Sequence, residues 1–389
     1  MNYISEKSID NEVTIATFID LSKAFDCLQY DKLFKKLESL GITGIELEWF
    51  KDYLSNRKQC VDLDGVQSEW IDVQLGVPQG SILGPILFLI YVNDINNCTD
   101  IASFTKFADD TTLLTSGKTL QDAAERMNIA LSQVDIWFQK NKLNLNPSKT
   151  RYMIFNSKSE ETDIIKLGDE YITRVHDKGK ETSFKLVGIQ IDEKLKWTEH
   201  INYICKKINY ALYGLTKSSK ELDERNKKLL YSGLIHSHLT FGLPMWGCAK
   251  KGRLNILLLK QKKAIRKIYN LKYREHTHDY FIKGNILKLP ELIKHTIMCY
   301  MQSGVWTYSP EHIKNLWQIR TSEINYLRDT TLKMTYTVTA KQWINDLPPI
   351  THAKIWNNNT QPKHDEPKDF KRYSKMDLLK QYETQKEDN

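Results

Sequence analysis

An apolar strand that ends in an aspartate restricts the fold of this chain more than any other sequence feature. Residues 13–19, VTIATFI, are apolar and β-branched, which predicts a buried strand, and Asp20 follows directly. Two short apolar runs within 104–114, FTKFADDTTLL, flank Asp109-Asp110 and predict two strands joined by an acidic turn. These positions would display the carboxylates at the rim of a sheet.

Helical patterns accompany these strands and become dominant after about residue 195. Asp64-Gly65 lies between alternating runs and predicts a hairpin. The sequence therefore predicts an α+β fold, in which an antiparallel sheet is backed by helices and followed by a helical region over about 195–300. The expected helices of the first part cover 31–54, with a break near Gly41 and Gly44, 82–93 and 119–141, and further strands are expected around 151–155 and 184–191.

Charge is distributed unevenly along the chain, whose formal net charge is +8. Residues 1–115 hold 9 Lys and Arg against 18 Asp and Glu, a net charge of −9, whereas residues 195–275 hold 18 against 5, a net charge of +13. An acidic region can bind cations and a basic region can bind a polyanion such as nucleic acid. The alternative is two solvated faces of opposite sign.

Compartment signals are few. The six cysteines show no CxxC spacing, which favours free thiols in a reducing compartment. No basic segment followed by an apolar core begins the chain, and the most apolar stretch, 82–92, is far shorter than the roughly 20 residues of a membrane span. The sequence predicts an intracellular protein, nuclear or cytoplasmic, that does not bind membranes.

Asp20, Asp109 and Asp110 are the candidate catalytic and metal-binding residues. Carboxylates brought together from separate strands can hold hard divalent cations, and two Mg²⁺ ions about 4 Å apart assist phosphoryl displacement. Aspartates are also common in turns, so a solvated acidic turn is the alternative for Asp109-Asp110 taken alone.

Three segments in order make the metal site the stronger hypothesis. They are Phe18-Ile-Asp20-Leu-Ser-Lys-Ala-Phe25-Asp26, then residues 76–88 (GVPQGSILGPILF), then Phe107-Ala-Asp109-Asp110. Together they resemble reverse transcriptases of non-LTR (LINE-type, jockey-like) retrotransposons. Residues 143–150 (LNLNPSKT) and 186–192 (LVGIQID) resemble two further motifs of that family, and 343–348 (WINDLP) resembles a C-terminal one, so the likeness extends to about residue 350.

The resemblance implies a right-hand polymerase that copies RNA into DNA by a two-metal mechanism, with Mg²⁺ or Mn²⁺ as cofactor. Its implied partners are an RNA template, a DNA primer and dNTPs, and the oligomeric state stays open. The implied domains are a partial palm over 1–192, a basic helical thumb over 193–300 and a C-terminal region over 301–389, whose polar tail from about 355 is expected to be disordered.

Residue roles follow from the resemblance one position at a time. Asp20, Asp109 and Asp110 would bind the metal ions, and the carbonyl of Leu21 would add a ligand. Phe25 would exclude a 2′-hydroxyl, with core packing as its alternative role. The remaining roles fall to Gln79 and Gly80, which would contact the nucleotide, and to Lys149, which would protonate the leaving pyrophosphate unless it is only a solvated lysine.

The basic helical pattern over 253–274 is the candidate nucleic-acid surface. Its positive residues would follow the phosphate backbone, and a solvated helix face is the alternative. The residues expected to bind nucleic acid are Lys262, Lys263, Arg266 and Lys267.

The short segment before Asp20 departs from the family pattern. Only 19 residues precede this aspartate, so we expect the fingers lobe to be largely missing and the chain to be N-terminally truncated. The expected result is little or no processive synthesis by the isolated chain, restored by a cognate fingers segment fused ahead of Asn2. The alternative function is an inactive remnant that at most binds nucleic acid through its thumb; a group II intron or bacterial reverse transcriptase is the weaker alternative among enzymes.

Overall fold

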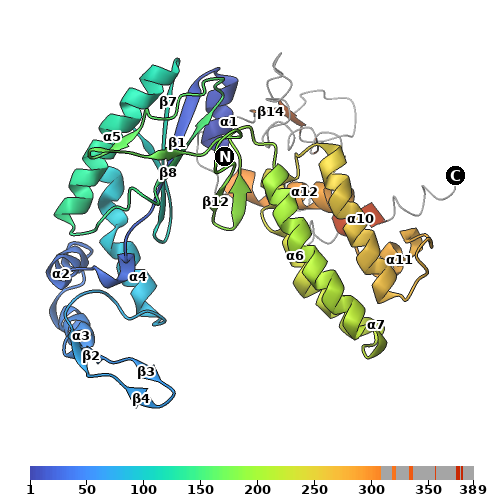
Figure 1. The fold of residues 1–389 in the computed structure, drawn as a ribbon, viewed down its shortest axis with the longest axis horizontal. Coiled ribbons are helices and arrows are strands. Elements are labelled where there is room, and N and C mark those ends of the chain that lie inside the picture. Colours follow the sequence, from blue (N-terminus) through green and yellow to red (C-terminus); the bar gives the residue numbers. More distant parts are fainter. Residues whose placement is uncertain (308–317, 321–332, 336–354, 356–373, 377, 380–389) are drawn as a thin grey trace. The chain divides into compact units, whose positions relative to one another are not determined.

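The computed structural model describes residues 1–307, 318–320, 333–335, 355, 374–376 and 378–379 (Figure 1). The chain divides into two units, which we name the strand unit, Asn11–Val187, and the helical unit, Met1–Asp10 with Gly188–Asn389. Most of the C-terminal region predicted over 301–389, including nearly all of the polar tail from about 355 and the segment 343–348, lies outside the described residues.

A five-stranded sheet with the order β11-β8-β1-β7-β6 forms the centre of the strand unit. The central strand β1 pairs antiparallel with β7 on one side and with β8 on the other, and every residue of β1 after Val13 is buried. This confirms the buried strand predicted at 13–19. The strands of the sheet are β1 (Val13–Ile19), β6 (Ser103–Phe107), β7 (Asp110–Gly117), β8 (Arg151–Phe155) and β11 (Thr173–Arg174).

The α+β class is confirmed, but the prediction of a purely antiparallel sheet is wrong. β11 pairs parallel with β8, with Thr173 opposite Arg151 and Arg174 opposite Tyr152. Parallel neighbours need a long crossover, and the connection 156–172 supplies it. Most of that connection is irregular apart from the short hairpin of β9 (Lys166–Leu167) and β10 (Glu170–Tyr171). The sequence there has no periodic pattern from which the parallel pairing of β11 could have been predicted.

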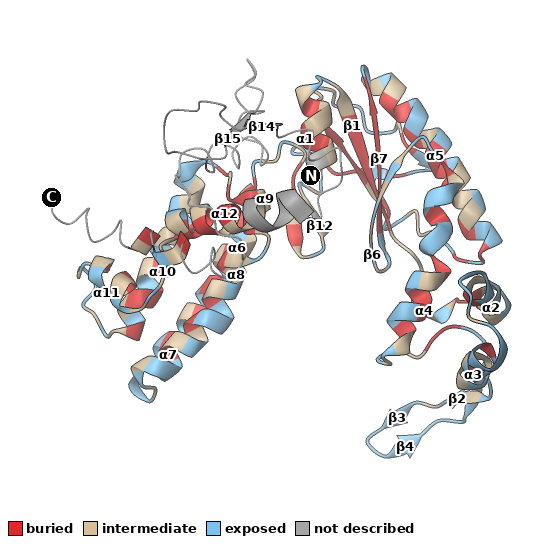
Figure 2. Cartoon of the chain, turned by 180° about the vertical axis from the view of Figure 1, so that it is seen from behind, coloured by how far each residue is buried: buried red, intermediate tan, exposed pale blue. Residues whose placement is uncertain are grey.

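Helix α5 (Leu120–Lys140) packs against β7 and β1 of the sheet. The Thr119 side chain caps it by accepting a hydrogen bond of 3.1 Å from the Asp122 N–H. Its buried positions recur every three or four residues, which is the pattern of an amphipathic helix, and Figure 2 shows the buried residues on the inner side of α5. These positions are Ala123, Ala124, Met127, Ala130, Leu131, Val134 and Phe138.

The remaining elements of the strand unit include the hairpin predicted at Asp64-Gly65, where both residues have positive φ, +51° and +85°. This hairpin is exposed (Figure 2). The break predicted near Gly41 and Gly44 within 31–54 is confirmed: two helices form there, because the chain turns at Gly41, which has φ +89°. These elements are α2 (Tyr30–Ser39), α3 (Gly44–Leu54), β2 (Arg57–Gln59), β3 (Asp62–Leu63), β4 (Val66–Gln67), β5 (Ile71–Val73), α4 (Leu83–Tyr91) and β12 (Phe184–Leu186).

The helical unit confirms the helices predicted over about 195–300. Trp197 and Trp246 are fully buried, and Gln261 is buried with its carboxamide bonded to the Tyr231 hydroxyl and the Leu287 carbonyl, each at 2.9 Å. The main elements are α1 (Asn2–Ile9), β13 (Ile189–Ile191), α6 (Thr198–Lys217), α7 (Glu224–Tyr231), a π-helical turn (Ser232–His236), α8 (Ser237–Thr240), α9 (Leu243–Trp246), α10 (Lys251–Ile268), α11 (His278–Lys283) and α12 (Leu289–Thr307), with β14 (Gln318–Arg320) and β15 (Lys333–Thr335) paired further along.

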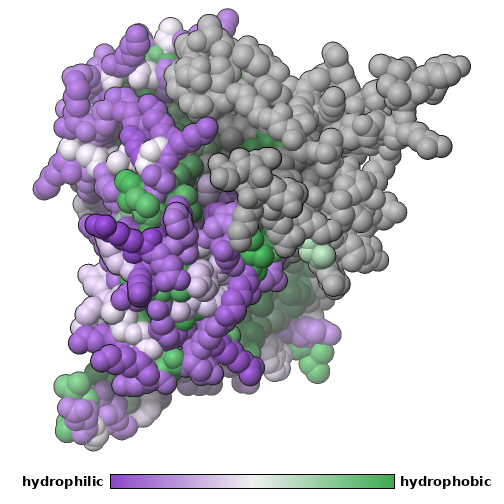
Figure 3. Space-filling view, turned by 90° about the vertical axis from the view of Figure 1, so that its right-hand side faces the viewer, coloured by the Kyte–Doolittle hydropathy of each residue, from purple (hydrophilic) through white to green (hydrophobic). Residues whose placement is uncertain are grey.

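On the face drawn in Figure 3, hydrophilic side chains cover most of the described surface and apolar side chains are scattered among them. Within the described residues, no helix combines the length and apolar character needed to cross a membrane.

Candidate active site

Asp20 directly follows β1 and Asp110 begins β7, and β1 and β7 are neighbouring strands of the sheet (Figure 1). In the antiparallel pair of β1 and β7, Ile19 is opposite Thr111. Continuing this register by one position sets Asp20, which follows β1, opposite Asp110, which begins β7. Residues opposite one another on antiparallel strands are the closest neighbours across a sheet. The fold therefore brings together two carboxylates that are far apart in the sequence.

Asp109 lies in the tight turn between β6 and β7. Phe107 pairs with Asp110, so only Ala108 and Asp109 make the turn. Two-residue hairpin turns need a positive φ at their first central residue, and Ala108 has φ +52°. This conformation costs a residue with a Cβ roughly 1–2 kcal/mol. The tight turn causes this strain, and it places the adjacent residues Asp109 and Asp110 at the start of β7.

The carboxylates at these strand ends, those of Asp20, Asp109 and Asp110, repel one another. Burial raises the pKa of Asp110 above its usual value, and the negative charges of Asp109 and Asp20 raise it further. Asp109 and Asp110 are exposed and Asp20 is half-buried, so all three are near solvent. A cation bound among them would relieve the repulsion, because an opposite charge favours the ionised form of a carboxyl group.

Hard divalent cations match the chemistry of these donors. Mg²⁺ prefers oxygen ligands and is usually held by one or two carboxylates, with water and substrate phosphates completing its shell. Within the described ranges, no group of three or more His, Cys, Asp or Glu side chains is gathered closely enough to enclose an ion. Asp20, Asp109 and Asp110 are therefore not gathered, in the part of the chain that the structure describes, into a set that could enclose an ion by itself.

The backbone of Asp20 is held by the loop that precedes β8. The Asp20 N–H donates to the Thr150 hydroxyl at 3.3 Å, and the Asn146 N–H donates to the Asp20 carbonyl at 3.0 Å. The Thr150 hydroxyl in turn donates to the Asn146 carbonyl at 2.8 Å, and Leu21 forms a β-bridge with Leu145. No role for Asn146 and Thr150 was predicted from the sequence. Both lie in the motif LNLNPSKT, which was the one sequence feature that could have indicated the turn that holds Asp20.

Lys149 belongs to this same loop. Its backbone N–H donates to the Asn146 carbonyl at 3.2 Å, and its side chain is exposed. Among the described residues its ammonium group makes no ion pair or hydrogen bond. The loop thus carries both the groups that hold Asp20 and the lysine predicted to act as a general acid.

Phe25 is joined to the glycine-rich loop 76–80 by backbone hydrogen bonds. The Val77 N–H donates to the Phe25 carbonyl and the Gly76 N–H donates to the Leu28 carbonyl, each at 2.9 Å. Gly76 has φ +78°, and a Cβ at this position would come within 2.7 Å of the Asp26 Cα. Only glycine permits this approach, which brings two segments of the predicted nucleotide-binding site together.

Two side chains of the predicted nucleotide-binding site, those of Phe25 and Gln79, also make contacts within the fold. The Phe25 ring stacks on the buried Phe88 ring with centroids 4.6 Å apart, so core packing is one of its roles. Gln79 and Gly80 are exposed, and the Gln79 amide donates to the Asp26 carboxylate at 2.9 Å. Asp26 orients Gln79, and this role could not be predicted from the sequence because the two residues are 53 positions apart in the chain.

The four basic residues predicted to bind nucleic acid lie on α10 with unequal exposure. Lys263 and Lys267 are exposed, whereas Lys262 and Arg266 are half-buried. The Arg266 guanidinium donates to the Glu275 carbonyl at 3.1 Å. Arg266 therefore helps to hold the segment after α10, and the four residues do not form one equally accessible patch.

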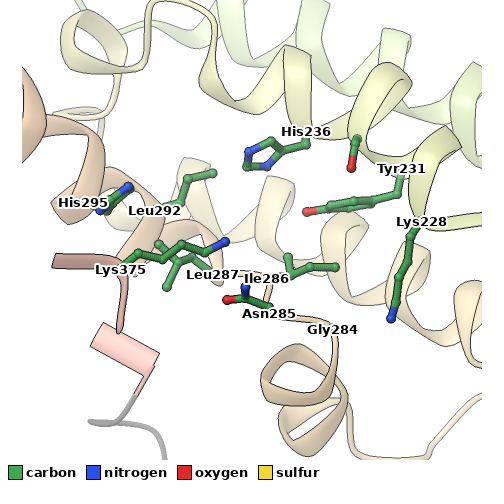
Figure 4. Close-up of a pocket in the computed structure, with 11 residues that line it drawn as sticks. Lys228, Tyr231, His236, Gly284, Asn285, Ile286, Leu287, Leu292, His295 and Lys375 are labelled. Carbon is green, nitrogen blue, oxygen red and sulfur yellow. The ribbon is translucent and has the colours of Figure 1, made fainter. Parts of the chain in front are cut away.

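A cavity of about 280 Å³ lies within the helical unit (Figure 4). Lys228, His236, His295 and Lys375 are among its lining residues, and none of the described residues that line it is an Asp or Glu. The Lys228 ammonium pairs with Glu224 at 2.8 Å. The cavity contains none of the predicted site residues and is separate from the set of strand-end carboxylates.

Comparison with known proteins agrees with this arrangement of motifs. Residues 3–191 match the family described as "Reverse transcriptase (RNA-dependent DNA polymerase)". This stretch, which contains all three aspartates, belongs to the reverse transcriptase family, and the chain is related to the polymerases of jockey-like non-LTR retrotransposons. The family is one of RNA-directed DNA polymerases, whose activity depends on metal ions.

The curated relatives come from insect mobile elements. "RNA-directed DNA polymerase from mobile element jockey" of Drosophila melanogaster is 26% identical over 315 residues, which are 78% of this chain and 33% of that protein. "Probable RNA-directed DNA polymerase from transposon BS" of Drosophila melanogaster is 27% identical over 303 residues, covering 74% of this chain and 32% of that protein. The chain thus spans about a third of the length of these relatives.

One solved structure with a detectable likeness is that of telomerase from Candida albicans in complex with a fragment of telomeric RNA. The two chains are 15% identical, with a TM-score of 0.40, and the match covers 78% of this chain and 51% of the other. A likeness at this level carries no weight for function.

Proposed function

We propose that Asp20, Asp109 and Asp110 form the catalytic centre of an RNA-directed DNA polymerase of a non-LTR retrotransposon. In this reaction the primer 3′-oxygen forms a bond to the α-phosphorus of a dNTP, and the bond to pyrophosphate breaks. The observation that carries the proposal is the register of β1 and β7, which sets Asp20 opposite Asp110, with Asp109 adjacent in the turn. Membership of the polymerase family supports the same assignment.

Metal binding is the proposed task of the three aspartates. Two Mg²⁺ ions, or Mn²⁺ in their place, would supply electrostatic stabilisation of the reacting oxygens. Asp20, Asp109 and Asp110 would hold them, with the backbone carbonyl of Leu21 as a further ligand. The raised pKa of Asp110 supports this role: burial is its largest cause, and the negative charges of Asp109 and Asp20 raise it further.

The neighbouring residues would bind and orient the nucleotide. Phe25, fixed against Phe88, would exclude a ribose 2′-hydroxyl by its bulk. Gln79, held by Asp26, and Gly80 would contact the incoming dNTP. Lys149 would donate a proton to the leaving pyrophosphate as a general acid.

The domain roles are part of this proposal. The palm would cover 1–192 and the thumb 193–300, with the basic residues Lys262, Lys263, Arg266 and Lys267 contacting an RNA template and a DNA primer. The net charge of +13 over residues 195–275 supports a polyanionic partner. The proposed place of action is inside the cell, in the nucleus or cytoplasm.

Primer extension tests the proposal. The purified chain is given an RNA template, an annealed DNA primer, dNTPs and Mg²⁺, and the same assay is run on the chain fused to the segment that precedes the matched region in the jockey polymerase. We expect extension at least by the fusion, with loss of that extension in its Asp109→Asn variant. Absence of extension by both proteins, with nucleic-acid binding intact, would favour the alternative of an inactive binding remnant.

A further inference from the structure

The outward face of α6 carries both aromatic and basic side chains. Residues three, four and seven apart lie on one side of a helix, and the side opposite the core of α6 holds tyrosines and lysines. The buried residues Ile201, Ile204, Ile208, Ala211 and Leu215 occupy the other side. We name this set the α6 stripe, in which Tyr203 is half-buried and the other members, Lys206, Lys207, Tyr210, Tyr213 and Lys217, are exposed.

Two tyrosines of the α6 stripe are strongly exposed. Tyr210 is 77% exposed and Tyr213 is 65% exposed. Tyr210 makes no ring contact or hydrogen bond with any residue that the structure describes. These rings therefore contribute little to the core of the helical unit and offer their faces to a partner.

Lysines accompany the tyrosine rings along the α6 stripe. The Lys207 ammonium lies 5.6 Å from the centre of the Tyr203 ring, and the Lys217 ammonium lies 5.7 Å from that of Tyr213. Helix α6 contains one carboxylate, Glu199, in its first turn. The face therefore combines a net positive charge with flat aromatic surface, which suits a partner that is both anionic and aromatic.

The α6 stripe differs from the basic residues of α10. On α10, Arg266 is bonded to the Glu275 carbonyl and Lys262 is half-buried, and the helix contains no tyrosine, phenylalanine or tryptophan. Helix α10 can thus attract a nucleic acid by its positive charge but has no aromatic ring to stack on a base. Aromatic rings add contact to base faces, and base faces are accessible where the strand is unpaired.

We propose that the α6 stripe binds single-stranded nucleic acid by stacking unpaired bases on Tyr210 and Tyr213 while its lysines contact the adjoining phosphates. The stripe from Tyr203 to Lys217 is about 21 Å long at 1.5 Å per residue, which is the length of about six stacked nucleotides. This inference rests on the proposed function, because the nucleic acid in question is the template of the polymerase. It adds that the segment bound by the α6 stripe is unpaired.

Fluorescence anisotropy with a labelled single-stranded RNA of about 12 nucleotides tests the inference on the full chain. Each stacked base contributes about 1–3 kcal/mol, so Tyr210→Ala combined with Tyr213→Ala should weaken binding by roughly 30-fold or more without changing the salt dependence. Tyr210→Phe with Tyr213→Phe should bind as the unchanged chain does. Lys207→Ala and Lys217→Ala should each lower the slope of log affinity against log salt by about 0.7.

Tyr171 of the strand unit provides the matched control. It is 52% exposed, and the Lys166 ammonium lies 4.6 Å from its ring, so Tyr171→Ala removes a similar aromatic and cationic pair elsewhere. We expect Tyr171→Ala to leave RNA affinity unchanged. Unchanged affinity in the double tyrosine-to-alanine variant would overturn the inference, as would an equal loss with a fully paired duplex of the same length.

Failure of this inference and failure of the proposed function give different results. Asp109→Asn should abolish extension and leave single-strand affinity intact. The tyrosine variants should lose affinity whether or not the chain extends a primer. An inactive chain that still binds through the α6 stripe would refute the catalytic assignment alone.

Discussion

The strand unit and the helical unit hold their candidate functional groups in different ways. In the strand unit, strand register, a strained turn and a loop bonded to the Asp20 backbone fix the carboxylates. In the helical unit, the candidate groups are long side chains on helix surfaces. Chemistry at a phosphate requires positions accurate to about 1 Å, whereas attraction of a polyanion requires charge over an area. Under the proposed function, the strand unit would therefore carry out the reaction and the helical unit would bind the nucleic acid.

The largest expected effect concerns the acidic site. Asp109→Asn removes one charge at the turn while keeping the shape of the side chain, and the loss of several kcal/mol of metal-assisted stabilisation corresponds to a decrease in rate of roughly 10³-fold. Single-nucleotide incorporation by the extended fusion protein measures it. Asp169→Asn, in the exposed turn between β9 and β10 of the same unit, is the control and should keep full activity. Equal loss in both variants would contradict the assignment.

The second prediction concerns binding by α10. Replacing Lys262, Lys263, Arg266 and Lys267 together by Ala should reduce affinity for nucleic acid and lower the slope of its salt dependence by at most about 3. We expect a smaller change from Arg266→Ala than from Lys263→Ala, because Arg266 already donates to the Glu275 carbonyl. Titrations at several salt concentrations supply both quantities. An unchanged slope would show that this side of α10 faces away from the ligand.

His200 in the helical unit and Asp110 in the strand unit should contribute to folding stability with opposite dependence on pH. His200 gives the larger effect. His200 is 2% exposed, and burial lowers its pKa from 6.5 to about 4. Between pH 6.5 and about 4 the unfolded chain binds a proton that the folded imidazole does not, so stability falls as the pH falls. The loss is at most about 3 kcal/mol.

Tryptophan fluorescence during urea unfolding measures this loss, because the Trp197 and Trp246 rings lie 6.5 and 5.6 Å from the His200 ring. His200→Gln removes the titrating group, so the stability of the variant should depend less on pH over the same interval. Identical pH dependence in the two proteins would show that His200 does not couple protonation to folding.

Asp110 should give the smallest effect and the opposite sign. Its pKa is raised in the fold, so the folded chain binds a proton more readily than the unfolded chain, and the contribution of Asp110 to stability decreases as the pH rises through the folded pKa. In metal-free buffer at neutral pH, Asp110→Asn should therefore slightly stabilise the chain, and the difference should disappear in acid. Thermal unfolding in the presence of a chelator measures it. Destabilisation by Asp110→Asn would contradict mutual repulsion among the carboxylates.

The sequence predicted those features that depend on local pattern. The apolar strand before Asp20 and the acidic turn at Asp109-Asp110 were sufficient to predict carboxylates at strand ends, and the structure forms both elements. The amphipathic helix at 119–141 was predicted because its buried face repeats every three or four residues. In these cases a short stretch of sequence contains the whole signal.

Features that depend on distant contacts were missed. The parallel pairing of β11 follows an irregular connection. The Asp20 N–H donates to the Thr150 hydroxyl and the Asn146 N–H donates to the Asp20 carbonyl, so both hydrogen bonds join residues that lie far apart in the chain. The bond between Gln79 and Asp26 is of the same kind. Arg266 was predicted from the helical pattern to be available for binding nucleic acid. In the folded chain its guanidinium donates a hydrogen bond to the Glu275 carbonyl, which the pattern could not indicate.

Direct measurement of metal binding tests the central claim, that the strand-end carboxylates form a cation site. Titration of Mn²⁺ into the purified chain, followed by the loss of the electron paramagnetic resonance signal of the free ion, counts bound ions without requiring activity. We predict binding by the unchanged chain that is retained in Asp169→Asn and lost when Asp20, Asp109 and Asp110 are all replaced by Asn. Equal Mn²⁺ binding by the unchanged chain and the triple variant would contradict the account.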